Sequence, residues 1–188
     1  MTEADRFWRR IYNYTERGYP VPWGYSVTLE PLTLDGAKGM LKLREQNRAA
    51  MRTEAPINEE DQENWFYHAT SRDSPRRWWQ VTRDKNAEVM GYCGIEDIKW
   101  IARTGEMSLL IDGSDDEWQD MFDLLLQKAF WELNLVEVHA EVYRCSPDID
   151  RWLRVQEVFG AYMVALPMRK YWDGQYWDGA YISWKLPV

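Results

Sequence analysis

An acidic turn directly before a helix is the feature of this chain that bears most on its chemistry. The turn, Asp112-Gly113-Ser114-Asp115-Asp116-Glu117, follows a strand-like run over residues 106–111. A strand that leads into a helix N-terminus forms an anion site, because free N–H groups and the positive end of the helix dipole face one point. Here the carboxylates occupy that point, where the dipole stabilises each by roughly 0.3–1 kcal/mol, and they would repel a pyrophosphate. A solvated, capped helix start and an altered phosphate site both remain open.

Composition predicts one soluble globular domain. The 188 residues are 45% hydrophobic and 29% charged, and no apolar run approaches the ~20 residues that cross a bilayer. The formal charge of −8 argues against sequence-independent binding to nucleic acid or anionic lipid, which depends on Lys and Arg. Cys93 and Cys145 are too few for a disulfide framework, which predicts a reducing compartment such as the cytoplasm.

The unusual residues are aromatic. The chain has 12 Trp and 11 Tyr, which can stack on a flat ligand but more commonly fill a core. His68 and His139 are its two histidines. With so few His and Cys and no metal-ligand spacing among them, we do not expect a metal site.

The order of the elements that must position these side chains predicts an α+β fold. Residues 1–24 carry apolar side chains at helical spacing and are expected to form a helical extension before a domain over residues 25–188. The crossover from strand 106–111 through helix 114–134 to strand 136–143 must be parallel and right-handed. Strands are also predicted over residues 25–34, 78–82, 89–101, 162–171 and 176–186, with a hairpin turn at 84–87, and helices over 35–51 capped by Asp35, from Asn58, and from Ser146 to a stop at Gly160.

Several short motifs resemble the GNAT superfamily of acyl-CoA-dependent N-acyltransferases. The resemblance covers residues 25–186 and is greatest to the branch with ribosomal-protein N-terminal and flagellar amino-sugar acetyltransferases. It implies a mixed, mostly antiparallel sheet of about seven strands flanked by helices, with a parallel fourth and fifth strand pair that opens into a V. The motifs are residues 57–66, Gly91-Tyr92-Cys93-Gly94-Ile95, Gly105-Glu106-Met107, residues 124–142 and Val158-Phe159-Gly160-Ala161.

The resemblance implies a donor site in that V. Acetyl-CoA or another acyl-CoA would be the co-substrate, with no metal. The family's phosphate loop reads roughly basic-or-Gln, two residues, Gly, any residue, Gly or Ala, whereas residues 114–119 here contain no glycine. The pantetheine arm would pair with the backbone of Leu109, Leu110 and Ile111, and the pyrophosphate would lie at the turn of Gly113, Ser114, Asp115, Asp116 and Glu117.

Three residues are implied at catalytic positions. Glu106 stands where many family members keep a carboxylate that relays the amine's proton through water, although a surface glutamate beside a turn is the alternative. Glu96 and Asp97 precede it on a strand and alternate in direction, so only one of them can face the cleft. Gln156 falls where family members often have the tyrosine that protonates the leaving sulfur, and glutamine is not an acid. These departures point to altered or absent use of CoA.

The acceptor is expected to be a small-molecule or peptide amine: an amino sugar, a nucleotide-linked amine or a peptide N-terminus. A catalytically silent binding module and an acyltransferase with a non-CoA donor are the alternatives. The Trp-rich strands are also compatible with a homodimer. The pocket residues implied are Trp79, His139, Tyr171, Trp172 and Tyr176, each of which could instead stabilise the sheet by cross-strand pairing or packing.

Overall fold

The structure is a computed structural model that describes residues 24–52, 57–83 and 88–186. Residues 1–23 of the predicted extension and the predicted turn at 84–87 lie outside this part of the chain. Within it, no helix combines the length and the apolar character that crossing a membrane requires. The elements are β1 (Val27–Pro31), α2 (Leu34–Gln46), the 3-10 helix η1 (Arg48–Ala50), α3 (Glu59–Thr70), β2 (Arg77–Arg83), β3 (Glu88–Lys99), β4 (Thr104–Ile111), α4 (Asp115–Gln127), the π-helical turn η2 (Lys128–Glu132), β5 (Glu137–Tyr143), α5 (Ile149–Val158), β6 (Tyr162–Trp172) and β7 (Gln175–Lys185).

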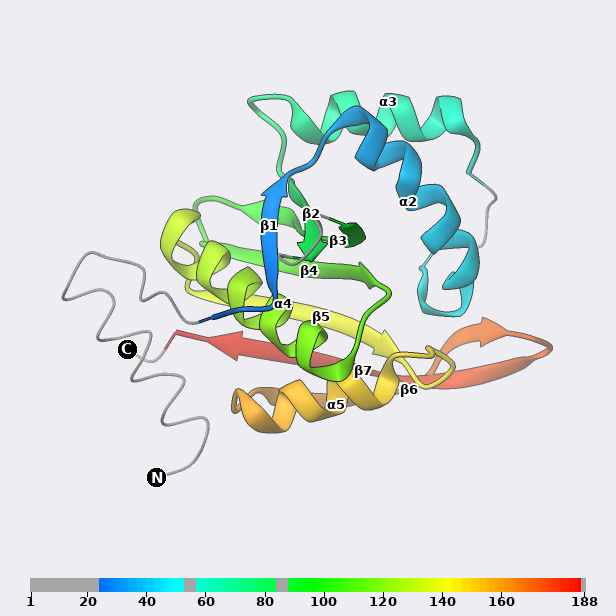
Figure 1. Ribbon diagram of the computed structural model, residues 1–188. Coiled ribbons are helices and arrows are strands. Elements are labelled where there is room, and N and C mark those ends of the chain that lie inside the picture. The colour runs from blue at the N-terminus through cyan, green and yellow to red at the C-terminus, as the bar shows by residue number, and fades with distance from the viewer. Residues whose placement is uncertain (1–23, 53–56, 84–87, 187–188) are drawn as a thin grey trace.

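One seven-stranded sheet organises these elements, in the order β1-β2-β3-β4-β5-β7-β6. Every neighbouring pair is antiparallel except β4 and β5, which are parallel. Helices α2 and α3 pack on one face, and α4 and α5 lie on the other (Figure 1). The predicted α+β class, strand number and parallel pair are therefore confirmed.

Helices α2 and α3 each begin directly after a residue whose side chain caps the helix N-terminus. Asn58 caps α3 with a reciprocal capping box to Asp61, as the sequence predicts. The predicted cap of α2 at Asp35 is wrong. Thr33 is the cap, because its backbone is extended and its hydroxyl accepts the Gly36 N–H at 3.1 Å. Asp35 lies inside the first turn, where the helix dipole favours a carboxylate.

The long helix predicted over residues 114–134 is interrupted. Ser114 caps α4, and the regular helix ends at Gln127. Over η2 the backbone widens, so that the Leu133 N–H donates to the Lys128 carbonyl at 3.0 Å, five residues earlier. Through this turn Ala129 and Phe130 both stay buried.

A cluster of aromatic rings fills the core between the sheet and helices α4 and α5. Trp118 and Phe122 stack on α4 with centroids 5.6 Å apart. Trp152 of α5 meets the Trp118 ring edge-on at 5.4 Å. Trp184 of β7 packs 5.0 Å from Phe122 and has no exposed surface. At Trp118, Trp152 and Trp184, the high tryptophan content serves packing.

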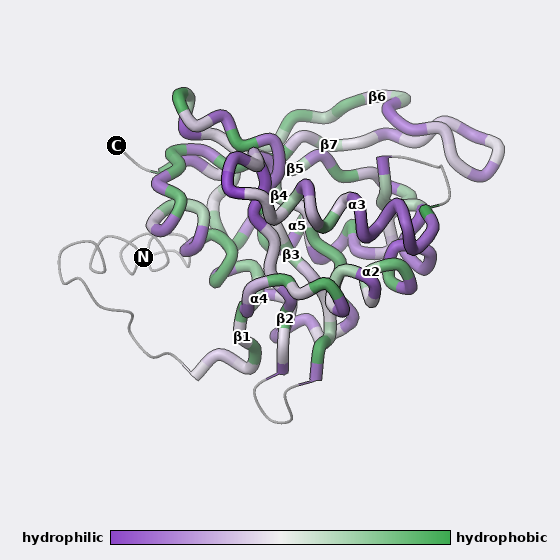
Figure 2. Tube along the Cα trace, turned by 90° about the horizontal axis from the view of Figure 1, so that it is seen from above, coloured by the Kyte–Doolittle hydropathy of each residue, from purple (hydrophilic) through white to green (hydrophobic). Residues whose placement is uncertain are grey.

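The β6–β7 hairpin extends beyond the rest of the molecule (Figure 1). β6 is an edge strand, and its first half is hydrophobic along the border of the fold (Figure 2). Its pairing with β7 shifts register between Leu166 and Lys170, where Met168 has a positive φ of 49°. Past this irregularity, Lys170 turns inward and is only 6% exposed.

Candidate active site

The parallel strands β4 and β5 separate soon after they begin. They pair at Thr104–Glu137, Gly105–Val138 and Glu106–His139, and the register gives no further pair along these fully described strands. The backbone of residues 107–111 is therefore unpaired on its β5 side. A cavity of about 240 Å³ lies here, and its lining includes Met107, Ser108, Leu109 and Leu110 of β4, Glu141, Val142 and Tyr143 of β5, and Ser146 and Trp152 near α5.

Glu106 lines this cavity, and with His139 it forms the last β4–β5 pair. Arg52 holds its carboxylate with both terminal guanidinium nitrogens. One, Nη1, donates to Oε2 at 2.9 Å, and Nη2 contacts Oε1. Burial raises the pKa of Glu106 above the usual range for glutamate, and the positive charge of Arg52 opposes that rise.

Glu96 faces the same cavity from β3, directly across the ladder from Glu106. Its carboxylate accepts the Trp78 indole N–H at 3.3 Å and lies 3.5 Å from Arg76. Burial raises the pKa of Glu96. Asp97 turns away at an irregularity in the strand, with a φ of 47°, and pairs with Lys99 outside the cavity. Of the two carboxylates, then, Glu96 is the one that faces the split.

A third carboxylate, Glu141, reaches the cavity from β5. Arg169 donates to its two oxygens at 2.8 and 3.0 Å, and the Tyr143 hydroxyl donates to Oε1 at 2.9 Å. The Arg169 hydrogen bonds lower the pKa of Glu141, so its carboxylate is ionised at neutral pH. The sequence analysis missed Glu141, although strand alternation places it on the same face as His139.

The unpaired backbone at the split suits the pantetheine arm of a CoA thioester, whose amides need hydrogen-bond partners. Leu109 and Leu110, two of the residues implied there, line the cavity. Ile111 does not. Its side chain is 5% exposed and belongs to the core, although its backbone, like that of Leu109 and Leu110, has no β5 partner.

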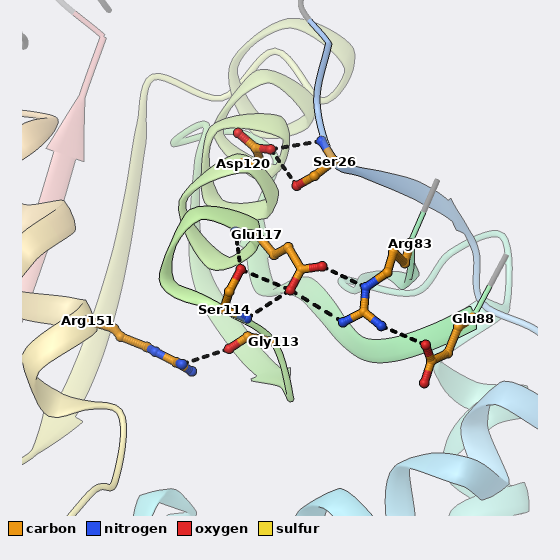
Figure 3. A network of polar contacts seen from close by, with 8 residues as sticks. All are labelled: Ser26, Arg83, Glu88, Gly113, Ser114, Glu117, Asp120 and Arg151. Carbon is orange, nitrogen blue, oxygen red and sulfur yellow. Dashed lines mark hydrogen bonds and ion pairs between the residues drawn. The ribbon is translucent and has the colours of Figure 1, made fainter. Parts of the chain in front are cut away.

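At the acidic turn, the Glu117 side chain caps the N-terminus of α4. Its carboxylate accepts the Ser114 N–H at 2.8 Å and the Ser114 hydroxyl at 3.0 Å. Arg83 of β2 donates to the same carboxylate at 2.6 Å and also to Glu88 (Figure 3). These hydrogen bonds, with that from Arg83 the strongest, lower the pKa of Glu117 to about 2. One N–H of the predicted phosphate site is thus taken by the chain's own carboxylate.

The neighbouring Asp115 is also ion-paired. Arg151 Nε and Arg154 Nη1 of α5 donate to its two oxygens, each at 3.0 Å. A second Arg151 nitrogen donates to the Gly113 carbonyl at 2.7 Å (Figure 3). The repulsion expected from the acidic turn is therefore offset by arginines.

We expect Glu117→Gln to lower the free energy of unfolding by about 1 kcal/mol at pH 7, because both the cap and the Arg83 ion pair weaken. The folded pKa of about 2 lies below the usual value of about 4.3. Stability from ionised Glu117 is thus complete above the unfolded pKa and is lost as the pH falls toward the folded one. Urea unfolding at pH 7 and pH 3 measures this.

Asp116→Asn is the matched control, since Asp116 is exposed in the same turn. It loses only the interaction of its charge with the helix dipole, so it should destabilise the fold less than Glu117→Gln at pH 7. An equal loss for Glu117→Gln at pH 7 and pH 3 would contradict the assigned role of its ionised form.

Gln156 and Trp79 do not reach the cavity. The Gln156 side-chain amide donates to the Ala161 carbonyl at 2.9 Å and stabilises the end of α5. Trp79 lies in the core on the α4 side of the sheet, 9% exposed. The side chain one residue earlier, Trp78, lines the cavity instead, with Trp65 edge-on at 5.3 Å.

The other implied pocket residues lie outside the cavity. His139 stacks on Tyr181 of β7 at 5.0 Å, and burial lowers its pKa. Tyr171 and Tyr176 pack against each other across the projecting hairpin at 5.2 Å, and both are more than half exposed. Trp172 lies beneath the Lys170 ammonium on the same hairpin. These contacts stabilise strands and do not form a pocket with Glu106.

The family model for the acetyltransferase (GNAT) domain matches residues 26–156. The chain belongs to the GNAT acetyltransferase family. GNAT acetyltransferases use acetyl-CoA as co-substrate. The sequence matches no curated protein. Within the described residues, no group of His, Cys, Asp and Glu side chains could hold a metal ion.

Solved structures share the fold of this GNAT chain. One is a chimera of the Vibrio cholerae spermidine N-acetyltransferase SpeG and hSSAT, with a TM-score of 0.73 and 18% identity over 86% of this chain and 96% of that one. Another is the dodecameric Vibrio cholerae spermidine N-acetyltransferase in an intermediate state, with a TM-score of 0.72 and 18% identity over 86% and 94%. At this identity the likeness concerns the fold alone. The branch suggested by the sequence motifs remains a prediction.

Proposed function

We propose that this chain transfers an acetyl group from acetyl-CoA to a primary amine, with the donor lying in the split between β4 and β5. The observation that supports this most is the unpaired backbone of residues 107–110 beside a cavity that also contains Glu96 and Glu106. Backbone groups that could bind the acetyl donor and carboxylates that could accept a proton thus lie beside the same cavity. Acetyl-CoA would supply the activated acetyl thioester.

The cavity's carboxylates would make the amine reactive. A primary amine is protonated at neutral pH and must lose a proton before it can attack a carbonyl group. Glu106 would accept this proton through water. Glu96 faces Glu106 across the ladder, and burial, with a smaller contribution from the charge of Glu106, raises the pKa of Glu96.

Protonation of the leaving sulfur has no evident side-chain donor among the described cavity residues. The cavity's phenol, Tyr143, donates its hydrogen to Glu141. Burial and this neighbouring carboxylate raise the pKa of Tyr143 to about 12. Tyr143 is therefore a weak acid at neutral pH. We assign the role of proton carrier to Glu106, which holds the proton taken from the amine.

Filling the split should abolish donor binding. Ser108 lines the cavity from the middle of β4, so the indole of Ser108→Trp would take up the space of a pantetheine arm. For the unaltered chain, acetyl-CoA at one hundred times its Kd should stabilise the fold by about 2.7 kcal/mol. Thermal unfolding with and without acetyl-CoA measures this, and Ser108→Trp should show no shift.

Thr28→Trp, on the exposed edge of β1, is the control and should retain the full shift. A Ser108→Trp variant that still responds to acetyl-CoA would place the donor elsewhere. An unaltered chain that shows no shift at millimolar acetyl-CoA would contradict the proposed function itself.

A second candidate function is a catalytically silent binding module of the same fold. It is favoured by Gln156, which stabilises a helix end where an acid is implied, and by Glu117, which closes the α4 N-terminus. Saturable acetyl-CoA binding with no acetyl transfer to any amine would support this candidate. The homodimer and the cytoplasmic location also remain proposals; they are motivated by the exposed apolar residues of β6 and by the two unpaired cysteines.

A further inference from the structure

We propose that Arg52 occupies the position of the acceptor's ammonium group, and that a cationic amine displaces it to bind between Glu106 and Glu141. Arg52 would then determine which amines the cavity accepts. This inference rests on the proposed function for the statement that the acceptor is an amine. It adds the residues that bind the amine and the charge that the amine must carry.

The Arg52 guanidinium spans the split between β4 and β5. Glu106 belongs to β4 and Glu141 to β5, and beyond Glu106 these strands are no longer paired. The Arg52 guanidinium donates to Glu106 at 2.9 Å and lies 3.7 Å from Glu141. Both carboxylates line the cavity. A single positive group therefore reaches both walls at the place where we expect the amine.

Glu106 and Glu141 differ in the hydrogen-bond and ion-pair partners that remain when the Arg52 side chain moves away. Glu141 retains both hydrogen bonds from Arg169 and the one from Tyr143, so its position does not depend on Arg52. For Glu106, Arg52 is the only ion-pair partner within the described part of the chain. A partly buried carboxylate left without a partner is unfavourable, so Glu106 would favour a replacement cation.

The Arg52 side chain can leave because it is 52% exposed. Water solvates such a guanidinium well in either position, which makes an exposed ion pair weak. A primary ammonium carries the same charge with three N–H donors, enough for both carboxylates. Trp65 and Trp78 line the same cavity and offer aromatic faces to a cation or an alkyl chain.

The backbone beside Arg52 is held in place, in contrast to its side chain. Lys170 of β6 is buried, and its ammonium donates to the Met51 carbonyl and, at 3.2 Å, to the Arg48 carbonyl. The same ammonium lies 5.1 Å from the Tyr143 ring centroid. The segment that carries Arg52 is therefore anchored to the hairpin, and a displaced side chain stays near the cavity. This arrangement favours reversible exchange with a ligand.

The test is the affinity for butylammonium chloride, titrated at neutral pH without an acyl donor and followed by calorimetry. Arg52→Met removes the competing charge and retains side-chain length. We expect it to bind butylammonium about tenfold more tightly than the unaltered chain, a change of about 1.4 kcal/mol. Arg52→Lys keeps a competing cation and should show no such gain.

Arg72→Met controls for net charge, because Arg72 is exposed in the turn after α3. It should bind as the unaltered chain does. Equal or weaker binding by Arg52→Met, an equal gain in Arg72→Met, or no butylammonium binding by any of the four proteins would overturn the inference. Tighter binding by Arg52→Met without any response to acetyl-CoA would uphold this amine site and contradict the proposed acetyl transfer.

Discussion

Replacing Glu106 with glutamine should lower kcat/KM for amine acetylation by about 10²–10⁴-fold at neutral pH, the range typical of a lost general base. Glutamine has nearly the same shape, so the β4–β5 pairing at this position should persist. What disappears is the group that takes the proton from the attacking amine. The acceptor would then react only through the small fraction that is already neutral.

The pH profile distinguishes this role from a structural one. Burial raises the pKa of Glu106, and the base form is lost as the pH falls through that value. In the unaltered chain kcat/KM should therefore drop on the acid side, whereas for Glu106→Gln activity should recover as the pH approaches the pKa of the free amine. Asp97→Asn is the control, since Asp97 points away from the cavity. An equal loss in Asp97→Asn, or a loss below about threefold in Glu106→Gln, would exclude Glu106 as the base.

Trp184→Ala should lower the free energy of unfolding by about 3–5 kcal/mol, as expected when a large buried ring is removed. Trp184 has no exposed surface and packs against Phe122 at 5.0 Å and Trp152 at 6.3 Å. These neighbours belong to different helices, so they cannot both move inward to fill the space. Much of the volume should remain as a cavity.

Chemical denaturation at neutral pH measures this loss. Trp100→Ala is the matched control, because Trp100 follows β3 and is 46% exposed, with the Arg77 guanidinium carbon 5.4 Å from its ring centroid. It should cost about 1 kcal/mol or less. If Trp184→Ala cost no more than Trp100→Ala, the aromatic cluster would not be a main source of stability.

The sequence predicts the fold well because apolar periodicity is a local property. The spacing of Trp118, Met121, Phe122 and Leu125 marks the buried face of α4, and the structure buries all four. The widening at η2 has no such signal. Ala129 and Phe130 of this turn belong to the core, so their surroundings are set by tertiary contacts that a local pattern does not contain.

The candidate site is only partly predictable, for a related reason. Alternation along β3 limits Glu96 and Asp97 to one cavity-facing residue, but the absolute register that selects Glu96 requires the ladder itself. The same one-residue ambiguity separates Trp78, in the cavity, from Trp79, in the core. Arg52 has no strand or helix pattern that would bring it to Glu106.

The acidic turn is a case in which local sequence is misleading about charge. Read alone, Asp115 and Glu117 predict a repulsive surface. Arg83 precedes this turn by about thirty residues and Arg151 follows it at a similar distance, and the fold brings both to the carboxylates. Such long-range pairing leaves no trace in the turn's own sequence.

Three residue pairs are a short connection for a sheet of seven strands. They join two half-sheets, β1–β4 and β5–β7–β6, so we expect any change in the angle between the halves to be centred on residues 104–106. Their angle sets the width of the gap that a donor must enter. The contacts among the rings of Trp118, Trp152 and Trp184 join α4, α5 and β7. We therefore expect this tryptophan packing to limit how widely the two strands separate, and with it the entry of a substrate.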